Sequence, residues 1–287
     1  MTENADFVDV LVVGAGLAGI GSACQLRRTM PELSLAILEA RAVSGGTWDL
    51  FCYPGIRSDS DMYTYSYGFK PWTDKSAIAD GDSILNYIRE AADEYDFNAH
   101  IRYNHKVVSA HWCSQDKLWT VTVVRSDGEE QLAIRSRFIL SCTGYYDYEQ
   151  GYTPEFAGVD DFQGEIVHPQ FWPEQLDYKD KRVVVIGSGA TAVTLIPSMA
   201  NDTASLVMLQ RSPTYIANVP AEDPWLKPLS KFMPSSWVFR SIRWKKVLLQ
   251  QYIYRLSRKK PRGLRRYLLN QVREELGPDY DVDTHFT

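Results

Sequence analysis

The chain has 287 residues, of which 45% are hydrophobic and 23% charged, and its net charge is −5. These values are typical of a globular protein with about two domains, and we expect no nucleic-acid partner. The four cysteines show no Cys-x-x-Cys or metal-type spacing, which argues against a metal site and against a flavin disulfide reductase. With no secretory signal and no membrane-spanning run visible, we expect a cytoplasmic protein.

The N-terminal region has the pattern of a dinucleotide-binding unit. A nearly continuous apolar run, residues 7–13, predicts a strand buried on both faces. The glycine-rich residues 14–19 follow and open a helix that stops at Pro31, and a second strand spans residues 33–38. This strand, turn, helix and strand predict a site where a pyrophosphate lies at the helix N-terminus.

We expect Gly14, Gly16, Ala18 and Gly19 of this first turn to bind the cofactor. Gly14 makes the turn, Gly16 lets the backbone approach the pyrophosphate, and Gly19, after Ala18, allows close packing of helix and strand. Glu39 ends the second strand, 20 residues after Gly19, and we expect it to accept hydrogen bonds from ribose hydroxyls.

A long loop, residues 41–63, follows the second strand and contains two short motifs. The motifs are Gly45-Gly46-Thr47-Trp48-Asp49-Leu50 and Tyr53-Pro54-Gly55-Ile56-Arg57-Ser58-Asp59. Gly-Gly and Pro-Gly pairs are common turn formers, so turn chemistry alone would explain both motifs. A loop this long in a compact domain is usually functional, however, and both interpretations are open at this point.

The next stretch predicts a helix with a purely structural role, followed by strands. Asp82 or Ser83 is expected to cap an amphipathic helix, and residues 101–140 are expected to form strands. Asp127-Gly128 is a favourable hairpin turn between two of these strands. We expect Trp112 and Trp119 to lie in the core.

A second unit echoes the first closely enough to count as an internal repeat. Residues 183–186 predict a strand, and residues 206–210 predict another. The turn and helix start between them consist of Gly187, Ser188, Gly189, Ala190, Thr191 and Ala192. The second strand ends in Gln210, Arg211 and Ser212 rather than in an acid, which removes repulsion of a 2′-phosphate and lets Arg211 bind it. This difference favours NADPH over NADH.

The C-terminal region is strongly basic. Residues 226–275 hold 14 Lys and Arg against 2 Asp and Glu, a net charge of +12, and the rest of the chain has a net charge of −17. Residues 236–257 and 264–276 predict helices. Either these helices are a solvated insert, or they form a peripheral contact with a membrane surface.

Between the two glycine turns, residues 162–173 read Phe-Gln-Gly-Glu-Ile-Val-His-Pro-Gln-Phe-Trp-Pro. Phe162 and Trp172 are expected to anchor in apolar pockets. The pattern Phe-x-Gly-x-x-x-His-x-x-x-Trp-Pro, set between two dinucleotide motifs, resembles the fingerprint of the type I Baeyer–Villiger monooxygenases. The sequence around this pattern is similar to that of the ethionamide-activating monooxygenase branch of the family.

The resemblance implies FAD and NADPH as cofactors. It places the segment with Thr47, Trp48, Asp49 and Leu50 along the flavin, and the backbone of Val107 against the adenine. The resemblance also places Arg57, Ser58 and Asp59 on the nicotinamide side, although Arg57 is equally well explained as a surface residue of the turn. Asp59 matches an acid that steers a catalytic arginine, and His168 is expected to couple the position of this segment to the cofactor state.

The implied reaction transfers one oxygen atom from O2, through a flavin C4a-peroxide, to a ketone or to the sulfur of a sulfide or thioamide. The expected fold is α/β, with an FAD-binding domain at 1–150, a linker at 151–177 and a partial NADPH-binding domain at 178–287 that carries the basic helical segment 213–287. Since the second unit supplies only one strand–helix–strand repeat, we expect a truncated chain. Two alternatives are an uncoupled NADPH oxidase-like flavoprotein and an inactive nucleotide-binding remnant.

Overall fold

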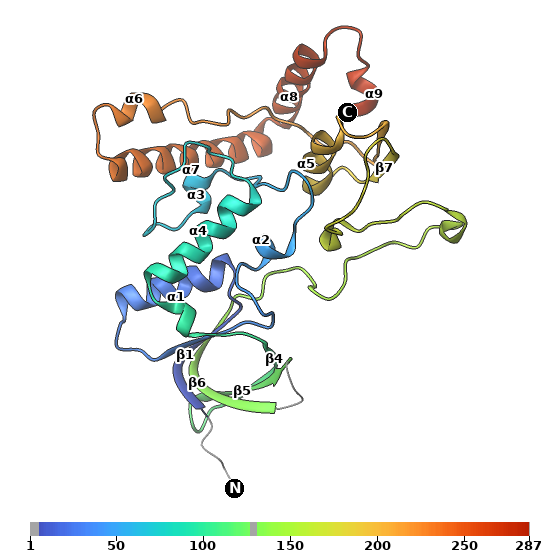
Figure 1. Cartoon of the computed structure of the whole chain (residues 1–287). Coiled ribbons are helices and arrows are strands. Elements are labelled where there is room, and N and C mark those ends of the chain that lie inside the picture. Colours follow the sequence, from blue (N-terminus) through green and yellow to red (C-terminus); the bar gives the residue numbers. More distant parts are fainter. Residues whose placement is uncertain (1–5, 127–130, 287) are drawn as a thin grey trace. The chain divides into compact units, whose positions relative to one another are not determined.

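A computed structural model describes residues 6–126 and 131–286, which form two compact units (Figure 1). The first unit contains the chain up to Cys52 and the segment Gly81–Pro173. The second unit contains Tyr53–Asp80 and Glu174 onward. The long loop expected at 41–63 is therefore divided between the two units, and it contains two short helices, α2 (Thr47–Leu50) and α3 (Met62–Tyr65).

The first unit is built on a six-stranded sheet with the order β3-β2-β1-β6-β5-β4. Its strands are β1 (Asp6–Val13), β2 (Leu35–Leu38), β3 (Ile101–Arg102), β4 (His105–Cys113), β5 (Leu118–Arg125) and β6 (Gln131–Ser141). β1 pairs in parallel with β2 on one side and β6 on the other, whereas β4, β5 and β6 form an antiparallel meander. The expected turn at Asp127-Gly128 lies outside the described residues.

The parallel strands create a switch point at β1. Val13, the last residue of β1, pairs with Leu38 of β2 and with Ser141 of β6. The chain leaves β1 towards β2 through a helix, while β6 lies on the opposite side of β1, so the connections diverge at this edge. Ligands of open α/β sheets bind at the carboxyl ends of the strands at such a point.

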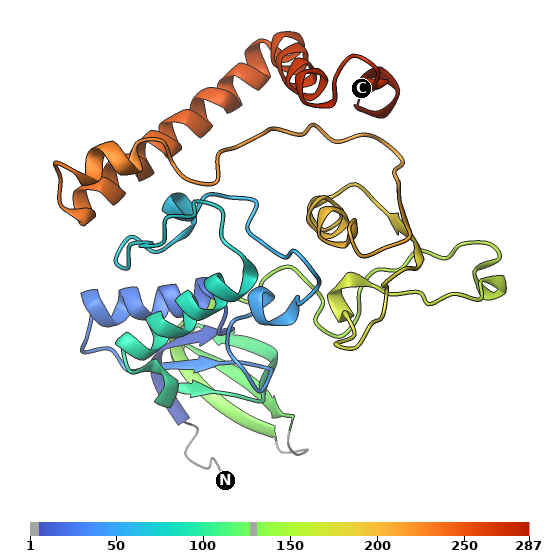
Figure 2. The ribbon, with the colours of Figure 1, turned by 45° about the horizontal axis from the view of Figure 1, so that its top comes forward.

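Two helices cover one face of the sheet. α1 (Leu17–Thr29) and α4 (Gly81–Glu94) lie side by side there (Figure 2). α1 buries Ile20. α4 buries Ile84 and Ile88, as its amphipathic pattern predicts. α4 begins at Gly81, so the expectation that Asp82 or Ser83 caps this helix is wrong; both residues lie inside its first turn.

The core of the meander is apolar and compact. Its buried members come from β1, β2, β5 and β6 and are Val8, Leu11, Ala36, Leu38, Val121, Val123 and Ile134. Trp119 packs against this cluster, but Trp112 is 42% exposed, so its expected place in the core is wrong. The ring of Trp112 instead lies 5.4 Å from the ring of Trp119, its partner across the β4–β5 pair.

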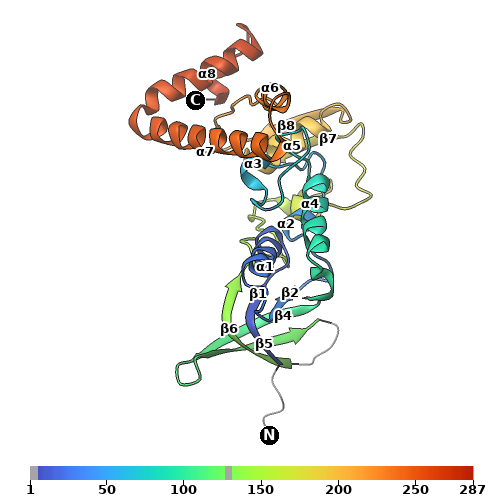
Figure 3. The ribbon, with the colours of Figure 1, turned by 90° about the vertical axis from the view of Figure 1, so that its left-hand side faces the viewer.

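The second unit contains a parallel pair of strands and a helical region. The pair is β7 (Arg182–Ile186) and β8 (Ser205–Leu209), connected through α5 (Ala190–Met199). The further helices are α6 (Leu226–Ser230), α7 (Ser235–Lys259), α8 (Pro261–Leu276) and α9 (Val282–Phe286). α8 leaves the end of α7 at an angle (Figure 3).

The first half of α7 is tied to the segment Tyr53–Asp80. Val238, Phe239 and Ile242 are buried, and the ring of Phe239 lies 6.0 Å from the ring of Tyr63 in α3. The Arg243 guanidinium donates 2.9 Å hydrogen bonds to the carbonyls of Tyr63 and Ser66. Over the described ranges, no helix has both the length and the apolar character needed to cross a membrane.

Candidate cofactor sites

The first glycine turn joins β1 to α1 at the switch point. The Gly14 N–H donates to the Leu38 carbonyl at 2.7 Å, which fixes the turn between β1 and β2. α1 starts immediately after Gly16, and the Ile20 N–H closes its first turn by donating to the Gly16 carbonyl at 3.0 Å. The N-terminus of α1 lies at the carboxyl edge of the sheet, where the helix dipole favours an anion.

Two glycines of this turn are required by the protein's own packing. A Cβ on Gly19 would lie 1.8 Å from the Gly14 oxygen, and one on Gly14 would lie 2.4 Å from the Cys142 oxygen. Gly14 also has a φ of +104°. The predicted close packing of helix and strand thus has a direct steric cause, while Gly16 has only an ordinary contact, 3.4 Å from its Cβ position to the Gly46 Cα.

Glu39 is buried, with 7% of its surface exposed, and its carboxylate is bonded inside the unit. One oxygen accepts from the Ala15 N–H at 2.8 Å and the other from the Arg41 N–H at 3.0 Å. A carboxylate offers about four acceptor positions, so ribose hydroxyls can still bind to it. The acid therefore also holds the glycine turn in shape.

The segment with Thr47, Trp48, Asp49 and Leu50 forms α2 instead of a loop. It reaches the first turn through the Gly45 N–H, which donates to the Ala15 carbonyl at 3.0 Å. Asp49 forms ion pairs of 2.6 Å with both Arg41 and Arg89, one to each carboxylate oxygen. These ion pairs connect α2 to the residues that follow β2 and to α4, while local hydrogen bonds such as the one from the Phe51 N–H to the Thr47 carbonyl, 3.1 Å, close the helical turn.

Val107 lies in β4, beside the end of β2. The His105 N–H donates to the Glu39 carbonyl at 2.8 Å, which brings the start of β4 to the acid of the first turn. Val107 pairs with Val123, and a register shift follows it. The backbone of Val107 is thus two residues from a direct contact with Glu39.

The fingerprint segment is held by its histidine and by Gln170. The Nδ1 atom of His168 accepts from the Gln170 N–H at 3.2 Å, and the ring packs against Gly151. Trp172 is partly buried. Phe162 is 60% exposed, so the expectation that it anchors in an apolar pocket is wrong. The ring of Phe162 instead lies next to Gly164 in its own segment.

The second glycine turn repeats the hydrogen bonds of the first. The Gly187 N–H donates to the Leu209 carbonyl at 2.8 Å, and the Val193 N–H donates to the Gly189 carbonyl at 3.0 Å. Ala190, Thr191 and Ala192 form the first turn of α5. No described heavy atom lies within 4 Å of a Cβ placed on Gly187 or Gly189, so the space in front of this turn is open.

Side chains at the end of β8 surround this open turn. The Ser188 hydroxyl donates to the Ser212 carbonyl at 3.1 Å, and the Gln210 amide donates to the His285 carbonyl at 2.9 Å. Arg211 is exposed, and among the described residues it has no ion-pair partner. Its guanidinium is therefore available to an anion.

The segment with Arg57, Ser58 and Asp59 belongs to the second unit. Gly55 packs on α5: its φ is +79°, and a Cβ there would lie 2.0 Å from the Ser198 hydroxyl oxygen. Ser58 is buried and is tied to Ala79 by two hydrogen bonds, of 2.8 and 3.2 Å, whereas Arg57 and Asp59 are exposed. The two residues expected to act in catalysis, Asp59 and His168, belong to different units.

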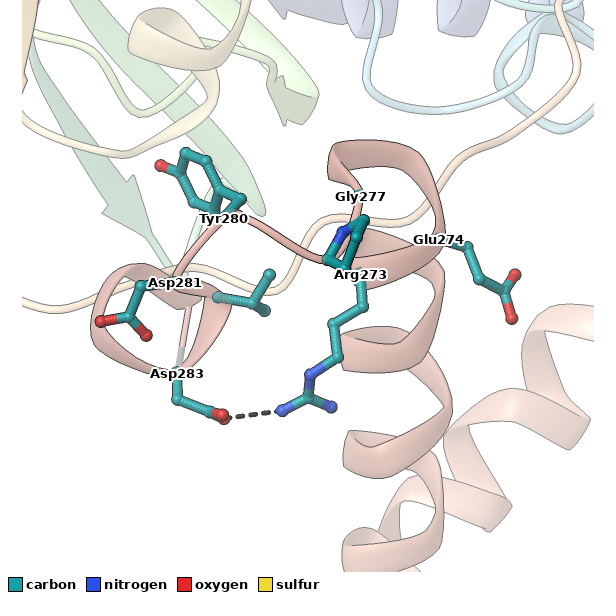
Figure 4. A pocket seen from close by; sticks show the side chains of 8 residues that line it. Arg273, Glu274, Gly277, Tyr280, Asp281 and Asp283 are labelled. Atoms are coloured by element: carbon teal, nitrogen blue, oxygen red, sulfur yellow. Dashed lines mark hydrogen bonds and ion pairs between the residues drawn. The ribbon is translucent and has the colours of Figure 1, made fainter.

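An open pocket of about 570 Å³ lies between the end of α8 and the start of α9 (Figure 4). Arg273 and Asp283 form an ion pair of 2.7 Å across it, and Tyr280 lines it as well. Its lining contains none of the predicted cofactor residues. Within the described ranges, no group of three His, Cys, Asp or Glu side chains is placed to hold a metal ion.

Comparison with protein families identifies the fold of both units. The model of the flavin-binding monooxygenase-like family matches residues 56–228, and that of an NAD(P)-binding Rossmann-like domain matches residues 12–75. The chain belongs to the flavin-binding monooxygenase-like family. The predicted α/β fold with Rossmann-like cofactor domains is thereby confirmed.

This flavin-binding monooxygenase-like protein has close relatives. It is 51% identical over its full length to the FAD-containing monooxygenase EthA of Mycolicibacterium smegmatis and 49% identical to EthA of Mycobacterium tuberculosis. It spans 57% and 58% of their lengths, respectively. The resemblance to the ethionamide-activating branch is thus confirmed for this part of those proteins.

Solved structures give the same assignment. A steroid monooxygenase bound to NADP is 34% identical, with a TM-score of 0.65, and the match covers 78% of this chain and 42% of that one. A cyclohexanone monooxygenase bound to ε-caprolactone is 27% identical with a TM-score of 0.69, covering 83% of this chain and 45% of that one.

Four residues near the first turn were not predicted from the sequence. They are Arg41, Arg89, Tyr148 and Gln170. Arg41 had a signal, since it follows Glu39 by two residues at the end of a strand. Tyr148 had one too, in the aromatic run that follows Thr143-Gly144. Arg89 and Gln170 had none, because their partners are distant in sequence.

Proposed function

We propose that the chain is the cofactor-binding part of an FAD- and NADPH-dependent monooxygenase. The first unit takes FAD and the second takes NADPH. The observation that carries this proposal is the repeated glycine turn, in which Gly14 and Gly187 make equivalent hydrogen bonds at the ends of parallel strands. The names of the relatives, FAD-containing monooxygenases and an NADP-bound steroid monooxygenase, agree with it.

The first turn fits the diphosphate of FAD. Gly16 leaves the backbone open at the N-terminus of α1, and Glu39 keeps acceptor positions for ribose. Thr47 and Trp48 in α2 and the backbone of Val107 extend the contact towards the flavin and the adenine, respectively. When bound, FAD supplies the redox chemistry, accepting hydride from NADPH and activating O2.

The second turn fits NADPH. The open space at Gly187 and Gly189 admits the pyrophosphate to the N-terminus of α5. Arg211 and Ser212 then bind the 2′-phosphate, which a guanidinium contacts with two parallel hydrogen bonds. Asp59 is proposed to orient a catalytic arginine whose positive charge supports oxygen transfer. His168 is proposed to couple the position of the fingerprint segment, residues 162–173, to the state of the bound cofactor.

The proposed substrates are ketones, which gain an inserted oxygen atom, and sulfides or thioamides, which are oxygenated on sulfur. Cyclohexanone, bound in one related structure, is such a ketone, and ε-caprolactone, bound in another, is the lactone that insertion of an oxygen atom into cyclohexanone gives. The alternative outcomes are NADPH oxidation with release of hydrogen peroxide and binding without turnover.

An absorbance spectrum of the purified chain tests the proposal first. A flavin band at one FAD per chain supports it, and no band after reconstitution refutes it. Gly16→Val should abolish most FAD binding, because the branched side chain occupies the backbone's approach to the pyrophosphate. Parallel assays of NADPH loss, peroxide and oxygenated product then separate the monooxygenase from the two alternatives.

We also propose that residues 226–275 contact anionic membrane surfaces. Trp237, Trp244, Leu248 and Tyr252 are all exposed and, at spacings of seven, four and four residues, lie along one side of α7. Aromatic residues beside Lys and Arg suit the headgroup region, where each basic residue adds about 1 kcal/mol of attraction.

Co-sedimentation with vesicles of anionic or neutral lipid tests this contact. Trp237→Ser with Trp244→Ser should reduce the fraction bound to anionic vesicles, while Trp112→Ser, an exposed tryptophan of the first unit, serves as the matched control. Equal binding to both vesicle types, unaffected by salt, would leave the solvated insert as the correct interpretation.

A further inference from the structure

The loop that follows β6 runs across the first glycine turn. The Cys142 N–H continues the pairing with β1 by donating to the Val13 carbonyl at 2.8 Å. Six residues later, Tyr148 returns to the turn: its hydroxyl lies 3.5 Å from where a Cβ on Gly46 would stand. A Cβ at that place would also lie 2.9 Å from the Gly16 Cα. The hydroxyl is therefore close to the glycine that the pyrophosphate approaches.

The surroundings keep this phenol protonated and oriented. The pKa of Tyr148 is raised above its ordinary value, chiefly by burial; a hydrogen bond with Thr47 lowers it, and the charge of Glu39 raises it. The Arg41 guanidinium lies 5.6 Å from the centre of the ring. A neutral phenol at this position is a hydrogen-bond donor, the type of group that binds a phosphate oxygen.

We propose that Tyr148 is a further FAD-binding residue, whose hydroxyl donates a hydrogen bond to the diphosphate. This inference rests on the proposed FAD site of the first unit and adds a side-chain donor to a turn that otherwise offers backbone N–H groups. The position of Tyr148 at the β1–β6 switch point, beside the N-terminus of α1, is where a diphosphate is expected.

The fingerprint segment holds this loop on both sides of Tyr148. Buried Gln170 donates a side-chain hydrogen bond to the carbonyl of Asp147, the residue before Tyr148. The His168 ring packs against Gly151, where a Cβ would lie 2.3 Å from the ring. Gln170 is thus a positioning residue for Tyr148, and it connects the fingerprint to the FAD site through contacts within one unit.

Titration of the full 287-residue chain with FAD, followed by flavin fluorescence, tests the role of Tyr148. Tyr148→Phe should raise the Kd for FAD about tenfold, as expected for loss of a hydrogen bond to a charged group. Tyr152→Phe is the matched control, because Tyr152 is a nearby tyrosine that is 88% exposed. Circular dichroism should show both variants folded. An unchanged Kd in Tyr148→Phe overturns the inference.

A double-mutant cycle tests the positioning role of Gln170. Gln170→Leu should weaken FAD binding several-fold, and Tyr148→Phe should then add much less than it does alone, because the tyrosine is already displaced. Fully multiplicative effects would overturn the coupling.

ADP, which carries the same diphosphate, separates this inference from the proposed function. The Tyr148→Phe defect should recur with ADP as a competitor. FAD binding by wild type with no difference in Tyr148→Phe refutes only the present inference. If the wild-type chain binds neither FAD nor ADP, both the proposed FAD site and the role of Tyr148 are refuted.

Discussion

The two glycine turns share one backbone design but differ in what surrounds them. At the first turn, the chain's own atoms occupy the space around Gly14 and Gly19 and bond both oxygens of Glu39. At the second turn, the space around Gly187 and Gly189 is open, and the third glycine is replaced by Ala192. Two glycines of the first motif therefore serve packing inside the unit, whereas the corresponding part of the second motif meets no other described segment.

The difference shows that a glycine in such a motif has two separable functions. It can remove a steric clash inside the protein, as Gly19 does, or it can leave room for a ligand, as proposed for Gly189. Only the first function is visible as lost stability when the glycine is replaced. The second is visible only when the cofactor is titrated, so paired substitutions in the two turns distinguish them.

The largest expected effect is that of Gly19→Ala. The added methyl group meets the Gly14 carbonyl, so α1 must move away from β1, at a cost of about 3 kcal/mol in the free energy of unfolding. Urea denaturation measures this. The matched variant Gly189→Ala should stay within about 0.5 kcal/mol of wild type. Equal losses in the two variants would contradict the proposed difference between the turns.

Glu39→Gln should have the next largest effect. An amide NH2 placed against the Ala15 or Arg41 N–H leaves buried donors facing each other, which costs about 1–3 kcal/mol of stability. Thermal unfolding without cofactor measures it. The control is Gln210→Ala at the equivalent position of the second turn, whose loss should be under about 1 kcal/mol. No loss in Glu39→Gln would mean that the carboxylate does not hold the turn.

Arg211→Ala should weaken NADPH binding about tenfold or more and leave NADH binding unchanged, because a charge-assisted hydrogen bond to the 2′-phosphate is lost. Titration of the variant with each cofactor separates the two effects. The exposed Arg262→Ala variant, titrated in parallel, shows whether any exposed arginine of this unit has the same effect. Equal losses for NADPH and NADH in Arg211→Ala would refute the 2′-phosphate role.

The smallest expected change in stability belongs to Gly189→Ala, and it makes the sharpest test of the open turn. Its methyl group meets no described atom within 4 Å, so stability should not change, but it projects into the proposed path of the pyrophosphate. NADPH binding should therefore weaken while FAD binding stays the same. Unchanged NADPH affinity would indicate that the cofactor does not approach this glycine.

Much of the framework was predictable from local sequence. The apolar runs before Gly14 and Gly187 predicted the strands β1 and β7, and β1 has the burial expected of such a run, whereas Val184 and Ile186 of β7 are exposed. The glycine spacing predicted the helix starts at Leu17 and Ala190, and Gly277 predicted the end of α8, where φ is +81°. These features depend on contacts between residues close in sequence.

What only the tertiary structure decided depends on partners far apart in the chain. Asp49 pairs with Arg89, 40 residues away, and Tyr148 reaches the first turn because β6 lies beside β1. The exposure of Phe162 had no local signal either, since an aromatic residue is buried only where other segments cover it. The amino-acid sequence thus determined the two turns, and long-range packing decided which of their glycines meet the protein's own atoms and which face open space.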